Sequence, residues 1–213
     1  MNIKSVLTGD IVQSTKIDVA WREQLVATIR RIADDLQQLS PLQLEFFRGD
    51  SFQLVVDRPE ESMKMAILLR AGLISATPAD SPMQWDARIS VGVGEVSYLA
   101  DRVVVSDGEA FRYSGRGLDE IGKRRIVVHT KWKEANDELQ VSTSFADDIV
   151  TGWTCAQAQV VYPTLLHDIA QKDLAAQCNK SAQNVSKLLT AAKEALIRQY
   201  LERYHSLLKQ KLS

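Results

Sequence analysis

The chain has 213 residues and an average composition, 45% hydrophobic and 25% charged, which excludes a disordered, collagen-like or disulfide-stapled protein. The net charge of −1 is unevenly divided: residues 155–213 carry eight basic and four acidic residues, a sum of +4, which leaves −5 for residues 1–154. The sequence has no signal-peptide pattern and no apolar run near the roughly 18 residues of a membrane span, so we expect a cytoplasmic protein of two units.

Apolar residues that recur every second position predict strands, and those spaced by three and four predict helices. In chain order the predicted elements are strand 3–12, helix 19–39, strands 42–47 and 52–56, helix 59–74, strand 87–94, helix 108–121 and strand 126–129. This order predicts an α+β fold, a ferredoxin-like βαββαβ sandwich over residues 1–154. Residues 131–153 lack clear periodicity and are interpreted as a connector that covers the edge of the core.

Two aspartates that are distant in sequence are expected to meet at one end of this sheet. In a ferredoxin-like topology the first two strands run parallel with the third between them, so the turn at Gly49-Asp50 lies beside Asp10, where the first strand ends. A pair of carboxylates at a sheet end can hold hard divalent cations that bind phosphates. The alternative is that each aspartate only shapes a turn, because Gly-Asp is common in loops.

Four sequence blocks, in the right order, resemble the motifs of class III nucleotidyl cyclases. Asp10-Ile-Val-Gln-Ser-Thr15 is similar to the first metal motif of that family, and Gly49-Asp50 falls where the family has its second metal aspartate. Arg88-Ile-Ser-Val-Gly-Val-Gly-Glu-Val96 and Gly108-Glu-Ala-Phe-Arg-Tyr-Ser-Gly-Arg-Gly-Leu118 resemble a strand motif and a helix motif of the same enzymes. Each block alone is weak, whereas the combination is fairly specific.

The resemblance implies roles for individual residues. Asp10, Asp50 and the backbone carbonyl of Ile11 would hold Mg²⁺ or Mn²⁺. Phosphates would be bound by Gln13, Ser14, Thr15, Arg112 and Arg116, and Arg116 would be catalytic if the chain is a cyclase. The family's site is built across a homodimer, which is therefore implied as well.

The sequence also departs from the cyclase pattern at positions that matter for catalysis. Arg112 replaces the transition-state asparagine, Phe46 aligns with the purine-reading residue, and Gln13 replaces the glycine of the phosphate loop. These departures favour a degenerate domain that senses a nucleotide or phosphate over a working cyclase. The alternative function is an active, Mg²⁺- or Mn²⁺-dependent purine nucleotide cyclase with an accessory helical domain.

Residues 155–213 are predicted to form a small all-α unit that contains a helix-turn-helix. Ala175 supplies the small residue at the helix crossing, Asn179 follows as a turn residue, and Ser181 can cap the second helix. Val185 and Leu188 are spaced to face the core. The pattern resembles helix-turn-helix regulators, and the alternative is a plain helical hairpin without a role in DNA binding.

The second helix of this unit would enter the major groove of DNA. Contacts to bases or phosphates are expected from Lys180, Ser181, Gln183, Asn184, Ser186 and Lys187. The helical pattern continues beyond Leu188 to Leu207, and this tail is expected to pack on the first domain or on a second protomer. Together the two units most resemble the SatD family of uncharacterised bacterial proteins. The hypothesis is a dimeric DNA-binding transcriptional regulator with a cyclase-like sensing domain.

Overall fold

The computed structural model describes residues 2–213 apart from 48, 99–102, 104, 105, 168 and 170. The strands are β1 (Ile3–Ile11), β2 (Leu42–Phe47), β3 (Ser51–Val56), β4 (Ala87–Tyr98), β5 (Asp107–Gly108) and β6 (Ile126–Thr130). The helices are α1 (Val19–Leu36), α2 (Ser62–Ser75), α3 (Glu109–Asp119), α4 (Lys133–Thr151), α5 (Cys155–His167), α6 (Gln171–Gln177), α7 (Ala182–Ala191) and α8 (Glu194–Leu212), with 3₁₀ turns η1 (Ser14–Lys16) and η2 (Pro59–Glu61).

The first four strands pair in the order and directions that the sequence predicts. The strand order of the sheet is β2-β3-β1-β4-β5, and β6 also pairs with β4. β3 is antiparallel to both β1 and β2, so β1 and β2 run parallel with β3 between them. The fifth predicted strand, at 126–129, is β6, and its parallel pairing with β4 extends the four strands β1–β4. The result is a mixed α+β fold with additional C-terminal helices.

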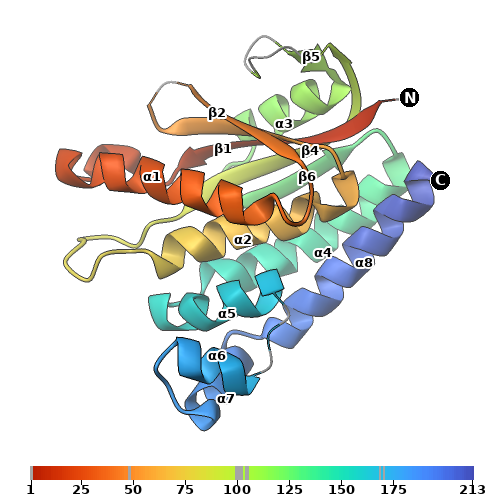
Figure 1. Cartoon of the computed structure of the whole chain (residues 1–213). Coiled ribbons are helices and arrows are strands. Elements are labelled where there is room, and N and C mark those ends of the chain that lie inside the picture. The colour runs from red at the N-terminus through yellow and green to blue at the C-terminus, as the bar shows by residue number, and fades with distance from the viewer. Residues whose placement is uncertain (1, 48, 99–102, 104–105, 168, 170) are drawn as a thin grey trace.

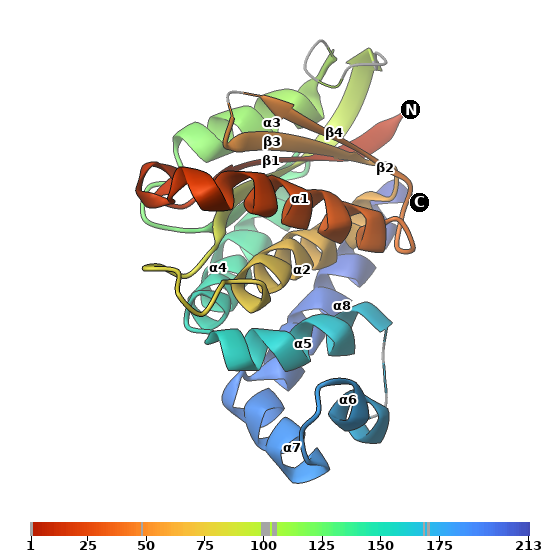
Figure 2. The same ribbon diagram turned by 60° about the vertical axis from the view of Figure 1, so that its left-hand side comes forward.

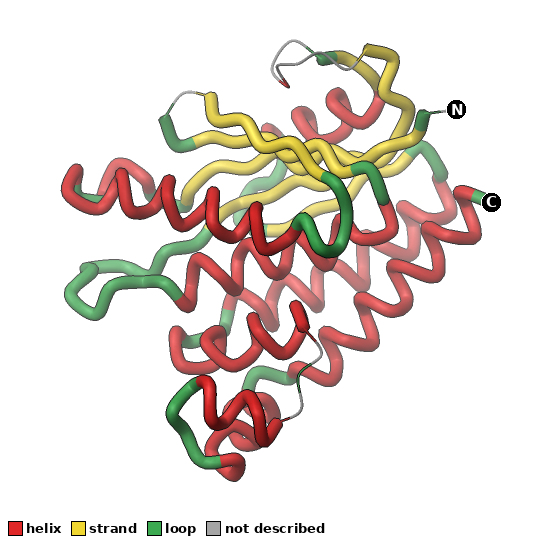
Figure 3. The backbone as a smooth tube through the Cα atoms, viewed as in Figure 1, coloured by secondary structure: helices red, strands yellow, loops and turns green. Residues whose placement is uncertain are grey.

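Helices cover both faces of the sheet, with α3 on one face and α1 and α2 on the other (Figures 1 and 3). The predicted alternation in β4 is confirmed, because Ile89, Val91 and Val93 are fully buried. α3 packs closely on the opposite face of β4 through glycines. A Cβ atom at Gly92 would lie 2.2 Å from the carbonyl oxygen of Ala110, so the absence of a side chain there allows the helix to approach the strand.

The expectation that residues 131–153 form a connector is wrong. Residues 133–151 form α4, a helix of 19 residues that packs on β6 and α8. Its buried face consists largely of small or polar side chains, including Ala135, Thr143, Ala146 and Asp147. Two large apolar side chains, Val141 and Phe145, are instead exposed. Hydrophobic periodicity therefore does not mark this helix.

The C-terminal helices lie on the far side of α2 from the sheet, with α6 and α7 at the end of the molecule (Figures 1 and 2). The prediction that the helix of residues 182–191 continues without a break is wrong: Lys193 has a left-handed backbone, with φ of 54°, and α8 begins at Glu194. α8 then runs back along α4 and η2, burying Tyr204 and Leu208. The tail thus packs on the sheet-bearing part of its own chain. Of the two expected partners, the first domain and a second protomer, the first is confirmed.

Buried side chains connect the two parts of the chain. One hydrophobic cluster extends from Leu7 in β1 to Leu208 in α8 and crosses the boundary expected at residues 154/155. The hydroxyls of Tyr204 and Ser62 are 2.8 Å apart inside it. That domain boundary stays a prediction. In the described part of the chain no helix is both long and apolar enough to cross a bilayer.

Candidate functional site

A cavity of about 280 Å³ lies beside the end of β1, between the first turns of α1 and the β2–β3 turn. Its walls are largely apolar, with Ile17, Leu25 and Ile29 among them. Phe46 also lines the cavity, and the guanidinium of Arg30 lies 5.0 Å from the centre of its ring. Such walls suit a flat or apolar portion of a ligand.

Polar groups gather at one side of this cavity. Ile11, Ser14, Thr15 and Asp50 all line it. The Ser14 hydroxyl donates to the Asp50 carboxylate at 2.5 Å, and the backbone N–H of Ile11 donates to the carbonyl of Asp50 at 3.2 Å. Arg22, which the sequence analysis did not single out as a site residue, contributes an exposed cation to the cavity lining. The cavity therefore offers a cation, hydroxyls and one carboxylate beside an apolar floor.

Asp10 does not line this cavity and is held by another residue. It is directly opposite Ser51 of β3 and Arg88 of β4, so the expected closeness of the two aspartate-bearing segments is confirmed. Arg88 donates from Nε and Nη2 to the two oxygens of Asp10, at 2.8 and 2.5 Å. This hydrogen bonding with Asp10 raises the pKa of Arg88. A cation bound by Asp10 must therefore compete with Arg88.

The oxygen-rich donor set fits a hard divalent cation in kind. Asp10, Asp50 and the Ile11 carbonyl are all hard oxygen ligands, the type that Mg²⁺ and Mn²⁺ prefer. The described residues contain no group of three or more His, Cys, Asp or Glu that could hold a metal by themselves. A cation here would accordingly take part of its coordination from water or from a phosphate.

The loop after β1, where Gln13, Ser14 and Thr15 are expected to bind phosphate, is not the start of a long helix. Residues 14–16 form only the short 3₁₀ turn η1, and α1 begins later, at Val19, with Asp18 as its cap. Gln13 has a left-handed backbone, with φ of 52°. The N–H of Val12 already donates to the carbonyl of Asp86 at 2.9 Å, so it is not free for a phosphate.

The two arginines of α3 lie apart from the cavity. Arg112 and Arg116 are exposed on the helix, and neither lines the cavity in the described structure. Arg112 forms an ion pair with Asp107 at 3.3 Å. The structure thus brings Ile11, Ser14, Thr15 and Asp50 together but does not bring Arg112 or Arg116 to them within one protomer. Their roles in phosphate binding or catalysis stay predictions.

The α6–α7 pair has the local geometry that the sequence predicts. Asn179 has a left-handed backbone, with φ of 50°, and the Ser181 hydroxyl accepts from the N–H of Asn184 at 3.2 Å as the cap of α7. Ala175 is buried at the crossing of the helices. α7 buries Val185 and Leu189, and Leu188 packs partly buried against the same core, so Val185 and Leu188 face the core as expected.

One side of α7 is open to solvent. Gln183, Asn184 and Lys187 are exposed, whereas Ser186 and Lys180 are partly buried.

The chain is similar to solved bacterial cyclases. It matches the structure of a bacterial light-regulated adenylyl cyclase with a TM-score of 0.41 and 15% identity, over 59% of this chain and 74% of the other. A second structure of such a cyclase matches with a TM-score of 0.40 and 15% identity, over 59% of this chain and 42% of the other. No family model and no curated protein matches the chain, so the resemblance to SatD proteins gains no support.

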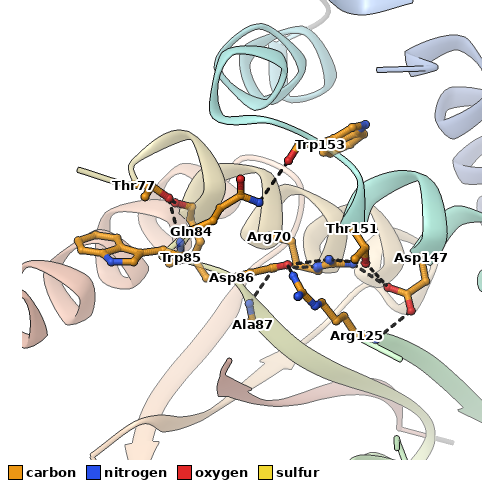
Figure 4. A network of polar contacts seen from close by, with 11 residues as sticks. Arg70, Thr77, Gln84, Trp85, Asp86, Ala87, Arg125, Asp147, Thr151 and Trp153 are labelled. Atoms are coloured by element: carbon orange, nitrogen blue, oxygen red, sulfur yellow. Dashed lines mark hydrogen bonds and ion pairs between the residues drawn. The ribbon is translucent and has the colours of Figure 1, made fainter. Parts of the chain in front are cut away.

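A buried polar network that sequence reasoning missed lies at the end of β4 nearest the cavity (Figure 4). Arg70 of α2, with no exposed surface, donates from Nε and Nη2 to the two oxygens of Asp86, each at 2.8 Å. Its Nη1 donates to Asp147 at 2.8 Å, and Arg125 also forms an ion pair with Asp86. The only sign of this network in the sequence is that Arg70 interrupts an apolar run at residues 65–74. Its partners come from distant segments, so the sequence gives no way to pair them.

Proposed function

We propose that the chain is a dimeric DNA-binding transcriptional regulator whose α+β part binds a nucleotide or another phosphorylated ligand. The observation that carries the proposal is the α6–α7 pair. Its turn residue Asn179 and cap Ser181 have the expected geometry, and α7 presents an exposed polar face at the end of the molecule farthest from the sheet (Figure 2). A regulator of this kind acts on DNA in the cytoplasm.

The exposed residues of α7 suit recognition in the major groove. The amides of Gln183 and Asn184 can donate to and accept from adenine edges, and Lys187 can bind a phosphate. Lys180, Ser181 and Ser186 flank them. The charge of +4 on residues 155–213 is modest, so two copies on a two-fold site would bind far better than one.

Duplexes selected from a random library would test this part of the proposal. We expect Gln183→Ala and Asn184→Ala to relax the selected sequence, at a cost of about 1–3 kcal/mol per lost base contact. Lys187→Ala should weaken binding to all duplexes and reduce the salt dependence by about one phosphate contact. Gln210→Ala is the matched control for the two amide variants, and Lys209→Ala is the control for Lys187→Ala. Both control residues are exposed near the C-terminal end of α8. Equal losses in the controls would contradict the proposal.

The cavity beside β1 supports the second half of the proposal. Thr15 and Arg22 offer donors to an anionic group, while the apolar walls with Phe46 suit a base or another flat ring. We propose Asp10, Asp50 and the Ile11 carbonyl as ligands of Mg²⁺ or Mn²⁺ in the liganded state. The cation would neutralise phosphate charge there, and the residues of this chain would orient the phosphates.

Binding of Mn²⁺, followed by electron paramagnetic resonance, tests the metal site without requiring any activity. Asp50→Asn should abolish it. Arg88→Gln should strengthen it about fivefold, because it removes a competing ion pair worth about 1 kcal/mol at a partly exposed site. Arg31→Gln is the matched control, since Arg31 pairs with Asp35 on the exposed side of α1. An unchanged affinity in Asp50→Asn would refute the site. Formation of a cyclic nucleotide from ATP or GTP would favour the cyclase alternative, with Arg116 as its catalytic residue.

A further inference from the structure

The segment that leads into β4 contacts three separate parts of the molecule through the consecutive residues Gln84, Trp85 and Asp86, and Figure 4 shows the contact of Gln84 with Trp153. The carbonyl of Asp86 accepts from the N–H of Val12, in the loop beside the cavity, at 2.9 Å. The ring of Trp85 packs edge-on against Trp21 of α1, with ring centres 6.4 Å apart. The Gln84 side chain donates to the carbonyl of Trp153 at 3.2 Å.

Arg70 locks this segment to the end of α4. Besides its two bonds to Asp86, its Nη1 donates to Asp147 at 2.8 Å and its Nη2 donates to Thr151 at 2.9 Å. A buried guanidinium with charged partners on both sides is costly to detach, because separation leaves a buried charge unpaired. The segment before β4 and the last turn of α4 therefore move together.

Trp153 lies two residues after the end of α4 and contacts the end of α7. Its side chain is buried, and its Nε1–H donates to the carbonyl of Ala192 at 2.8 Å. Ala192 is the residue that ends α7, and the left-handed Lys193 comes next. One side chain thus connects the end of α4 to the point where α7 turns into α8.

We propose that Trp153 is a positioning residue that couples the loop beside the cavity to the orientation of α7. The proposal rests on the function proposed above and adds how the ligand would regulate DNA binding. A ligand that displaces Val12 also displaces Asp86, which carries the end of α4 and hence Trp153 with it. The indole then moves the carbonyl of Ala192 and the last turn of α7.

The four tryptophan indole N–H signals in ¹H–¹⁵N spectra of the full chain provide the readout. The loop is perturbed in two ways: by Ser14→Ala, which needs no ligand, and by inorganic triphosphate with Mg²⁺. We expect the Trp153 signal to shift in both cases and the Trp132 signal, at the other end of α4, to stay in place. In Gln84→Ala the Trp153 shift should shrink while the Trp21 shift remains, a change that a merely structural contact would not produce.

Hydrogen exchange at the amides of α7 tests the second half of the coupling. Trp153→Phe keeps one aromatic ring in place of the indole and removes the donor, so exchange in α7 should accelerate about fivefold or more, since the loss of one hydrogen bond alone gives about fivefold. Trp132→Phe is the matched control and should leave α7 unchanged. The proposal is overturned if Ser14→Ala shifts Trp21 but not Trp153, or if Trp153→Phe leaves α7 exchange as in the wild type. Failure of triphosphate or DNA to bind would count against the proposed function alone, because the Ser14→Ala and exchange results need neither.

Discussion

At the scale of single residues, the environment of His129 sets a pH dependence of stability. His129 lies half-buried in β6, and its ring lies against Gly117 of α3. Burial lowers the pKa of its imidazole below the ordinary 6.5; the nearby Glu120 opposes this shift and Arg124 adds to it. The folded chain thus binds a proton at His129 less readily than the unfolded chain does.

We predict that His129 destabilises the fold as the solution becomes acidic. Above pH 6.5 the histidine is neutral in both states and costs nothing. As the pH falls below 6.5 the unfolded chain takes up a proton first, so the free energy of unfolding decreases until the folded pKa is reached. Urea unfolding at pH 7.5 and 5.5 measures this change. It should be smaller in His129→Gln and unaltered in His167→Gln, which changes an exposed histidine.

The sequence predicted part of the candidate site at this scale. The closeness of Asp10 to the Gly49-Asp50 turn follows from strand order, because antiparallel pairing puts Asp10 opposite Ser51. The pairing of Asp10 with Arg88 depends on the register between β1 and β4 and on side-chain rotamers, which no local pattern encodes. No sequence pattern marks Arg22 as a site residue, and its place in the cavity lining depends on the three-dimensional packing of α1.

At the scale of secondary-structure elements, the contact between α3 and the sheet depends on glycine. A Cβ at Gly117 would lie 2.3 Å from the Ser90 hydroxyl and 2.6 Å from the His129 ring, so the helix would have to move away from β4 and β6. At Gly115, two positions earlier, a Cβ would meet no atom within 4 Å. The same substitution therefore has opposite consequences at these two positions.

We predict that Gly117→Ala destabilises the fold by about 1–3 kcal/mol, the usual cost of overfilling a packed interface. Gly115→Ala should instead stabilise it by up to about 1 kcal/mol, because alanine loses less backbone entropy in a helix. Urea unfolding of both variants measures the difference. Equal effects would mean that α3 does not pack on β4 and β6 as described.

Elements with strong periodicity were predicted well, and α4 was not. β4 alternates cleanly because one of its faces is filled with Ile89, Val91 and Val93. α4 buries alanine, threonine and Asp147, since its neighbours β6 and α8 lie close and Arg70 supplies a charged partner. Its exposed Val141 and Phe145 obscure the pattern further. A helix that packs through small and paired polar side chains cannot be predicted from the spacing of its apolar residues.

At the scale of the whole molecule, the C-terminal helix completes the core of the sheet-bearing part. α8 lies along α4 and η2 and inserts Tyr204 and Leu208, both fully buried (Figure 1). Exposed ion pairs such as Arg203 with Glu138 lie at the rim of this contact and contribute little. The division of charge between residues 1–154 and 155–213 therefore does not mark two separate cores.

We predict that residues 1–154 do not fold alone, because removing α5 and α8 exposes apolar surface of α2 and α4 that the full chain buries. The full chain should unfold in urea in one transition that coincides by tryptophan fluorescence and by far-ultraviolet circular dichroism. Leu208→Ala should lower the free energy of unfolding by about 2–5 kcal/mol as a core truncation. The exposed neighbour Lys209→Ala should change it by less than about 0.5 kcal/mol. A cooperative transition of the 1–154 fragment, or two separate transitions of the full chain, would show instead that the two parts are independent folding units.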